Sequence, residues 1–207
     1  MDGLIFDTED TYFKAGVVLL ARRGEVYTKE LDSVGMGQPP KVCFDHLKEI
    51  FGFPETWQEL HTESEDIFMK LLDDGFSTMP GLYELLEHLE QRNIPKGICT
   101  SSTRRVASEV LRQKDLAKRF DFVLTLEDVI QGKPAPEIYL KAAERFGIDP
   151  SEMLVLEDSP AGCQAASSAG ASAIAVRAKH NAHCTFAGAK KEVSALNDPQ
   201  IMGLFDA

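Results

Sequence analysis

Carboxylates, a lysine and hydroxyls that could do chemistry occur at four points of the chain. Asp2 lies near its start, Thr100 follows one apolar run, and Lys133 stands in the sequence Gly-Lys-Pro-Ala-Pro. Glu157 and Asp158 come directly after Met-Leu-Val-Leu. Two adjacent carboxylates repel each other when buried without a cation, and Mg²⁺ commonly uses one or two protein carboxylates together with waters. A rigidly held lysine can pair with a phosphate as a point charge. These residue types therefore indicate chemistry on a phosphate group, assisted by a metal ion.

Each of these positions also has a simpler structural explanation. Residues 100–103, Thr-Ser-Ser-Thr, stand at the start of a predicted helix and could simply cap it, although the free amides of a helix start also form a natural phosphate site. Lys133 could be a solvated loop residue, and Asp158 could cap the helix that follows it. The individual residues leave these alternatives open.

Strands and helices alternate through the second half of the chain. The predicted strands cover residues 96–100, 122–126, 153–156 and 173–176. They are continuous apolar runs rather than alternating ones, which is typical of a parallel sheet covered by helices on both faces. The polar clusters follow three successive strands, and open α/β sheets bind ligands at the carboxyl ends of their strands. Beyond residue 178 the pattern fades into a mixed tail.

Residues 10–78 have the apolar spacing of helices and no alternating strand pattern. The predicted helices centre on residues 13–20, 43–51 and 57–71, and the composition of residues 35–40 predicts a loop. The sequence therefore predicts an α/β core domain formed by residues 1–9 and 79–207, and a small helical domain formed by residues 10–78.

Composition limits the possible partners. The net charge of −11 argues against a nucleic-acid partner, because such affinity comes largely from Lys and Arg. The four cysteines are far apart in sequence, which favours free thiols in a reducing compartment. No apolar run is long enough for a membrane span, and Met1 is followed by an acid rather than a basic leader. We therefore expect a cytoplasmic protein, as a monomer or weak dimer.

Four phrases resemble, in order and spacing, the motifs of the haloacid dehalogenase (HAD) superfamily. They are D-G-L-I-F-D-T-E from Asp2, C-T-S-S from Cys99, G-K-P-A-P-E from Gly132 and L-E-D-S-P-A-G from Leu156. The subgroup that is most similar contains β-phosphoglucomutase and the sugar-phosphate or pseudouridine-phosphate phosphatases. The resemblance implies a three-layer, Rossmann-like parallel sheet core with an inserted helical-bundle cap domain at residues 10–78.

The resemblance also implies a reaction. It is the Mg²⁺-dependent hydrolysis of a small phosphorylated metabolite, a sugar or nucleoside phosphate, through an aspartyl-phosphate. The implied site consists of Asp2 as general acid–base and metal ligand, Thr100, Ser101 and Lys133 around the phosphoryl group, and Glu157 and Asp158 as metal ligands. A cap that closes from residues 35–38 would exclude water and select the leaving group.

One part of the first motif is missing. The family's nucleophilic aspartate falls one position before Met1, and the nearest carboxylate, Asp7, is interpreted as structural. A chain with these 207 residues is therefore expected to be nearly inert, and its sheet to have a gap where the central strand belongs. The favoured interpretation is that an apolar strand ending in aspartate precedes Met1 in the natural protein. The alternative is a degenerate, non-catalytic phosphate-binding member.

A phosphomutase is the other enzymatic alternative. It needs cap groups, usually cationic, that grip a second phosphate, and the loop of residues 35–40 has none before Lys41. The phosphatase is therefore favoured. Finally, His180 and His183 form an H-x-x-H pair in the tail, and we predict a solvated tail rather than a metal site there.

Overall fold

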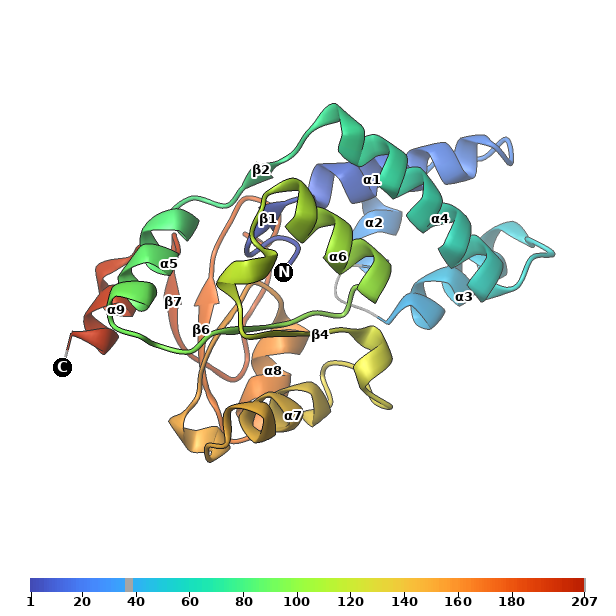
Figure 1. The fold of residues 1–207 in the computed structure, drawn as a ribbon. Helices are drawn as coiled ribbons and strands as arrows, with labels where there is room; N and C mark the ends of the chain where they lie inside the picture. The colour runs from blue at the N-terminus through green and yellow to red at the C-terminus, as the bar shows by residue number, and fades with distance from the viewer. Residues whose placement is uncertain (36–38, 207) are drawn as a thin grey trace. The chain divides into compact units, whose positions relative to one another are not determined.

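The computed structural model describes residues 1–35 and 39–206. It divides into two compact units (Figure 1). The core unit comprises Met1–Asp7 and the chain from Ser77 onward, and the helical unit comprises Thr8–Phe76. The sequence had suggested boundaries after residues 9 and 78. Residues 36–38 of the predicted cap loop lie outside the described residues.

The helical unit is built from amphipathic helices. They are α1 (Glu9–Ala21), α2 (Lys29–Gly35), α3 (Pro40–Phe51) and α4 (Trp57–Leu71), followed by the 3-10 turn η1 (Leu72–Asp74). α1 and α4 pack side by side, and Tyr12 stacks on Phe68 with ring centroids 4.1 Å apart (Figure 1). Thr56 and Glu59 form a capping box that starts α4, because each side chain satisfies the other's backbone amide.

The core unit contains the predicted parallel strands. Two of them pair with each other, β3 (Gly97–Cys99) with β4 (Phe122–Leu124). Three more form a sheet in the order β5-β6-β7, with β5 Leu154–Glu157, β6 Ser172–Val176 and β7 Ala189–Val193. In the described parts of the chain, no ladder joins β3 to β5, so the parallel strands form two separate groups. A short antiparallel pair, β1 (Phe6–Asp7) with β2 (Ser77–Thr78), was not predicted.

Helices alternate with these strands, which confirms the α/β class. They are α5 (Leu82–Gln91), α6 (Arg104–Gln113), α7 (Glu137–Phe146), α8 (Pro160–Ser168) and α9 (Pro199–Met202). Short 3-10 turns complete the unit: η2 (Ala117–Arg119), η3 (Leu126–Asp128), η4 (Pro150–Glu152) and η5 (Gly203–Phe205). Among the described residues, no helix is both long and apolar enough to cross a membrane.

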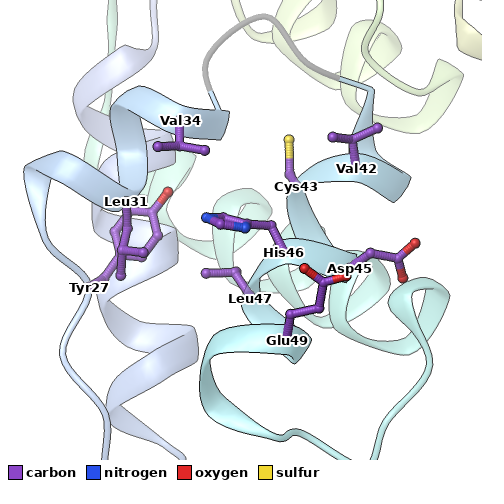
Figure 2. A pocket seen from close by; sticks show the side chains of 9 residues that line it. All are labelled: Tyr27, Leu31, Val34, Val42, Cys43, Asp45, His46, Leu47 and Glu49. Atoms are coloured by element: carbon purple, nitrogen blue, oxygen red, sulfur yellow. The ribbon is translucent and has the colours of Figure 1, made fainter.

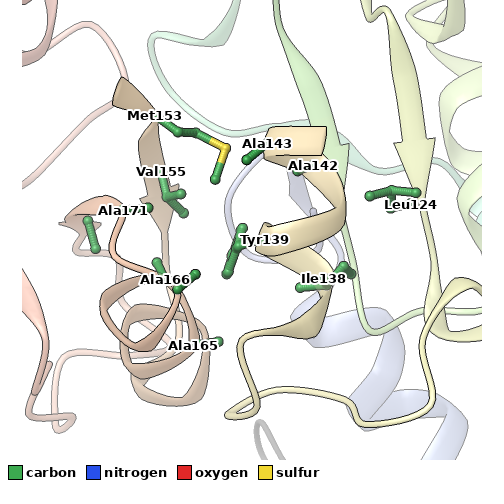
Figure 3. Close-up of a cluster of buried hydrophobic side chains, with 12 residues drawn as sticks. Leu124, Ile138, Tyr139, Ala142, Ala143, Met153, Val155, Ala165, Ala166 and Ala171 are labelled. Carbon is green, nitrogen blue, oxygen red and sulfur yellow. The ribbon is translucent and has the colours of Figure 1, made fainter. Parts of the chain in front are cut away.

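A cluster of buried apolar side chains joins α7 and α8 to β5 (Figure 3). Ile138 and Tyr139 of α7 face this cluster, and α8 contributes the small residues Ala165 and Ala166. Small side chains let a helix approach a strand closely, and close packing leaves little room for change in volume. This packing holds α7 and α8 in place against β5.

Two sequence predictions about the strands were wrong. The strand predicted to reach residue 126 ends at Leu124, because Thr125 and Asp128 form a capping box that turns the chain into η3. The tail predicted to be mixed contains β7, an edge strand whose middle residues, from Lys190 to Glu192, are exposed. An edge strand with charged residues lacks the continuous apolar run by which the inner strands were recognised.

The contribution of the buried face of α7 to stability can be tested with two substitutions in this helix. Ile138 is 2% exposed, and Leu140 is 44% exposed. Ile138→Ala is expected to lower the free energy of unfolding by about 2–5 kcal/mol, because it removes buried methyl groups and leaves a cavity. Leu140→Ala should change it by less than about 0.5 kcal/mol. Urea unfolding measures both, and equal losses would contradict the assigned packing.

Candidate active site

Lys133 lies between the carboxyl ends of β3 and β5. Its Nζ donates a hydrogen bond to the backbone oxygen of Cys99 (3.1 Å), the last residue of β3, and to Oε1 of Glu157 (2.5 Å), the last residue of β5. Lys133 is 9% exposed, so the alternative of a solvated loop lysine is wrong. One buried ammonium group therefore connects two strand ends that share no ladder hydrogen bonds.

The carboxylate of Glu157 is surrounded by donors of the core unit. Its Oε1 also accepts a hydrogen bond from the hydroxyl of Tyr139 (2.5 Å). Its Oε2 accepts hydrogen bonds from Ser159 Oγ (2.9 Å) and from the backbone amides of Asp158 and Ser159 (3.2 Å each). A Cβ on Gly162 would lie 2.0 Å from the Glu157 carboxyl carbon, so only glycine fits there. Both carboxylate oxygens are thus occupied by the protein itself.

Lys133 and Glu157 each stabilise the charged form of the other. Burial by itself raises the pKa of Glu157, but the positive charges of Lys133 and of the chain's amino group, with hydrogen bonds from Lys133 and Tyr139, lower that pKa to about 2. Burial by itself lowers the pKa of Lys133, but the Glu157 charge outweighs burial and raises it. Both groups are therefore ionised at neutral pH and neutralise each other.

A chain of hydroxyls connects β3 to Asp2. Thr100 follows β3 and is buried, and its Oγ1 accepts a hydrogen bond from the Ser102 amide and donates one to Ser102 Oγ (both 3.1 Å). Ser102 Oγ in turn donates to Oδ2 of Asp2 (2.6 Å). The capping alternative is confirmed for Thr103, which is the N-cap of α6 and accepts a hydrogen bond from the Val106 amide. Thr100 itself is oriented toward Asp2 through Ser102.

Asp158 lies against Gly3 and a histidine from the tail. Its Oδ2 lies 3.0 Å from Nε2 of His180. Gly3 has a left-handed φ of +69°, and a Cβ there would lie 2.2 Å from the same Oδ2. Glycine at position 3 therefore brings the backbone next to Asp2 close to the Asp158 carboxylate. Asp158 does not cap α8, because Ser159 is its N-cap and accepts from the Gly162 amide.

The structure thus gathers the predicted site residues where β3 and β5 end, at the edge of the core unit that we call the rim. Lys133 contacts Glu157 and the residue before Thr100, Thr100 connects through Ser102 to Asp2, and Gly3 brings Asp2 next to Asp158. Ser101 also lies there and is exposed. The metal-ligand and catalytic roles remain predictions.

Sequence reasoning missed several residues of this rim. Tyr139, Ser102 and Ser159 hold the charged side chains, and His180 with Asn181 holds Asp158. The predicted solvated tail is wrong for His180, whose side chain is 13% exposed. The only signal in the sequence was that His180 follows the carboxyl end of a strand, where ligand-binding residues of such sheets gather.

The helical unit contains a cavity of its own, of about 370 Å³ (Figure 2). It is lined by Tyr27, Leu31, Val34, Val42, Cys43, Asp45, His46, Leu47 and Glu49. Asp45 and Glu49 add negative charge, and the described lining contains no lysine or arginine. Carboxylates repel a phosphate, so Asp45 and Glu49 disfavour phosphate binding in this cavity.

Known proteins are similar to this chain over most of its length. Residues 1–176 match the haloacid dehalogenase-like hydrolase family. A "Phosphorylated carbohydrates phosphatase" of Thermotoga maritima is 36% identical over 174 residues, covering 82% of this chain and 79% of that protein. A "Probable pseudouridine-5'-phosphatase" of Drosophila melanogaster is 34% identical over 182 residues, covering 85% of this chain and 78% of that protein. The solved structure of a beta-phosphoglucomutase from Clostridium difficile superposes with a TM-score of 0.82 at 24% identity, covering 99% and 94% of the two chains, and supports the fold.

The chain therefore belongs to the haloacid dehalogenase-like hydrolases, and its named relatives place it among the phosphatases of that superfamily. The resemblance noted from the four motifs is confirmed. So is the α/β core with inserted helices.

The buried pair makes a testable contribution to stability. Glu157→Gln leaves Lys133 buried without a charged partner, and breaking such a pair costs about 3–5 kcal/mol. Because the folded-state pKa of Glu157 is lowered from 4.5 to about 2, its contribution is complete above pH 4.5 and is lost as the pH falls toward 2. The difference between parent and variant in free energy of unfolding should therefore be large at pH 7 and shrink below pH 4.5.

Urea unfolding at pH 7 and pH 3 measures this difference. Glu144→Gln is the matched control, because Glu144 is an exposed residue of α7, and its effect should be small at both values. A Glu157→Gln variant as stable as the parent at pH 7 would show that the pair does not stabilise the rim.

Proposed function

We propose that this chain is a Mg²⁺-dependent phosphatase that acts on a small phosphorylated metabolite, a sugar or a nucleoside phosphate. The observation that carries the proposal is the gathering of Lys133, Thr100, Asp2 and Asp158 at one rim of the core unit. The names of the relatives support the substrate class, because they act on phosphorylated carbohydrates and on pseudouridine phosphate.

The charges at the rim support a divalent cation. Asp2, Asp158 and Glu157 are acidic and Lys133 is basic, so these side chains together carry a net charge of about −2 when ionised. A phosphate monoester would be repelled by this charge, since Lys133 is already neutralised by Glu157. One divalent cation would offset it. Oxygen ligands suit Mg²⁺, which keeps several waters and needs one or two carboxylates.

Asp158 fits the role of metal ligand better than Glu157 does. The oxygens of Glu157 accept from Lys133, Tyr139 and Ser159, and binding an ion would require the loss of some of these bonds. Asp158 and the backbone carbonyl of Asp2 are the donors that we assign to the ion. Glu157 then acts mainly on Lys133, by keeping it charged and in place. When bound, the ion would neutralise phosphoryl oxygens and help align the attack.

The remaining roles follow from contacts at the rim. Lys133, whose charge Glu157 balances, would donate a hydrogen bond to the transferring group, and Thr100 with the Ser101 amide would hold it. Asp2, whose Oδ2 is held by Ser102, would donate a proton to the leaving oxygen and later accept one from the attacking water. The helical unit, Thr8–Phe76, would act as the cap that excludes water and selects the leaving group.

The attacking carboxylate of the family has no counterpart in these 207 residues. Loss of a covalent nucleophile costs on the order of 10⁶ in rate. We therefore propose that these 207 residues by themselves hydrolyse phosphate esters very slowly, while retaining the sites for the metal ion and the phosphate.

An extended chain tests this proposal. An apolar strand ending in aspartate, added directly before Met1, should give Mg²⁺-dependent release of phosphate from p-nitrophenyl phosphate and from sugar or nucleoside phosphates. The 207 residues alone should be slower by a factor on the order of 10⁶. EDTA or Asp158→Asn should abolish the activity of the extended chain, and Asp73→Asn, at an exposed aspartate of the helical unit, should not.

The same assay separates the alternatives. Isomerisation of a sugar phosphate without net release of phosphate would identify a phosphomutase. An extended chain that binds phosphate but releases none in the presence of Mg²⁺ would instead support a non-catalytic phosphate-binding protein.

A further inference from the structure

His180 is the feature of the rim that neither the family motifs nor the proposed roles include. It follows β6 in the chain, and its ring Nε2 lies 3.0 Å from Oδ2 of Asp158. The two side chains are each 13% exposed. In the tautomer whose Nε2 carries the hydrogen, the ring donates a hydrogen bond to the Oδ2 oxygen.

Asn181 fixes the segment that carries this histidine. Its Nδ2 donates to the backbone oxygens of Asp158 (2.9 Å) and Val176 (3.1 Å), and its Oδ1 accepts from the Ala178 amide (2.8 Å). Asn181 is 1% exposed, so these bonds are shielded from water. The turn after β6 is thereby tied to the end of β5, and His180 is held beside Asp158.

The two oxygens of the Asp158 carboxylate differ in their contacts. Gly3 and His180 both lie against Oδ2, since a Cβ on Gly3 would come within 2.2 Å of Oδ2 and 2.7 Å of Nε2. Within residues 1–35 and 39–206, no hydrogen bond is found to the other oxygen, Oδ1. A cation approaching Asp158 can therefore bind Oδ1 while His180 holds Oδ2.

We propose that His180 is a positioning residue: its Nε2–H holds Oδ2 of Asp158, so that Oδ1 faces the divalent cation. This inference rests on the proposed function, because it assumes that Asp158 is a ligand of the ion. Partners that orient metal ligands typically change metal affinity by about 10–100-fold when they are removed. His180 is thus expected to act through Asp158 and not to touch the substrate.

Divalent-ion affinity of the 207-residue chain tests the inference without turnover. Mn²⁺ binding is followed by electron paramagnetic resonance, and Mg²⁺ by its competition with Mn²⁺. His180→Ala should weaken both by about 10–100-fold. His180→Gln should recover most of the loss, because its side-chain amide can donate to Oδ2. His183→Ala is the matched control and should match the parent, since the ring of His183 lies against Cys184 Sγ (3.7 Å).

The outcomes separate the two proposals. Saturable binding in the parent that is unchanged in His180→Ala would overturn the positioning role and leave the proposed function standing. Failure of His180→Gln to recover affinity, or direct ¹⁴N coupling to bound Mn²⁺ in the parent, would also overturn it by making the imidazole itself a ligand. Absence of saturable Mn²⁺ or Mg²⁺ binding in the parent would overturn the metal site, and with it both proposals. Thermal unfolding of each variant shows whether an affinity change reflects a folded protein.

Discussion

The buried ion pair between Lys133 and Glu157 is the interaction on which the rim depends. No ladder joins β3 to β5 among the described residues, yet Lys133 bonds to the last residue of each. A charge in this position is costly unless it is paired and fully hydrogen-bonded. Tyr139 from α7 and Ser159 at the start of α8 complete the set of donors. The Glu157 carboxylate and the Lys133 ammonium group therefore connect two strands and two helices by hydrogen bonds.

The carboxylates of the rim lie in different environments. Glu157 is buried and saturated with donors, which favours a structural role. Asp158, the next residue, is held through one oxygen by His180, and Asp2 is held through Ser102. Because Lys133 is neutralised by Glu157, the positive charge that a phosphate requires must come from elsewhere, and in the proposed function a divalent ion beside Asp158 and Asp2 would supply it. The acidity of the rim and its expected anionic substrate are therefore compatible.

The sequence predicted the α/β class, the inner strands and the polar strand ends because each has a local signature. Continuous apolar runs marked β5 and β6, and the motif residues Thr100, Lys133 and Asp158 stood directly beyond such runs or in a rigid loop. The partners of these residues had no such signature. Tyr139 lies on an apolar helix face, and β7 is a charged edge strand. His180 was taken for tail because its contact with Asp158 spans 22 positions and depends on the turn that Asn181 fixes.

The central claim is that this rim holds a divalent ion and a phosphoryl group next to each other. Phosphorus NMR of inorganic phosphate, titrated with the chain and Mn²⁺ and compared with phosphate and Mn²⁺ alone, tests it most directly. We predict that the chain enhances paramagnetic relaxation of the phosphorus nucleus in a saturable manner, and that Asp158→Asn removes this enhancement. Saturable binding of phosphate whose relaxation does not respond to bound Mn²⁺ would contradict the claim, because the two sites would then be separate.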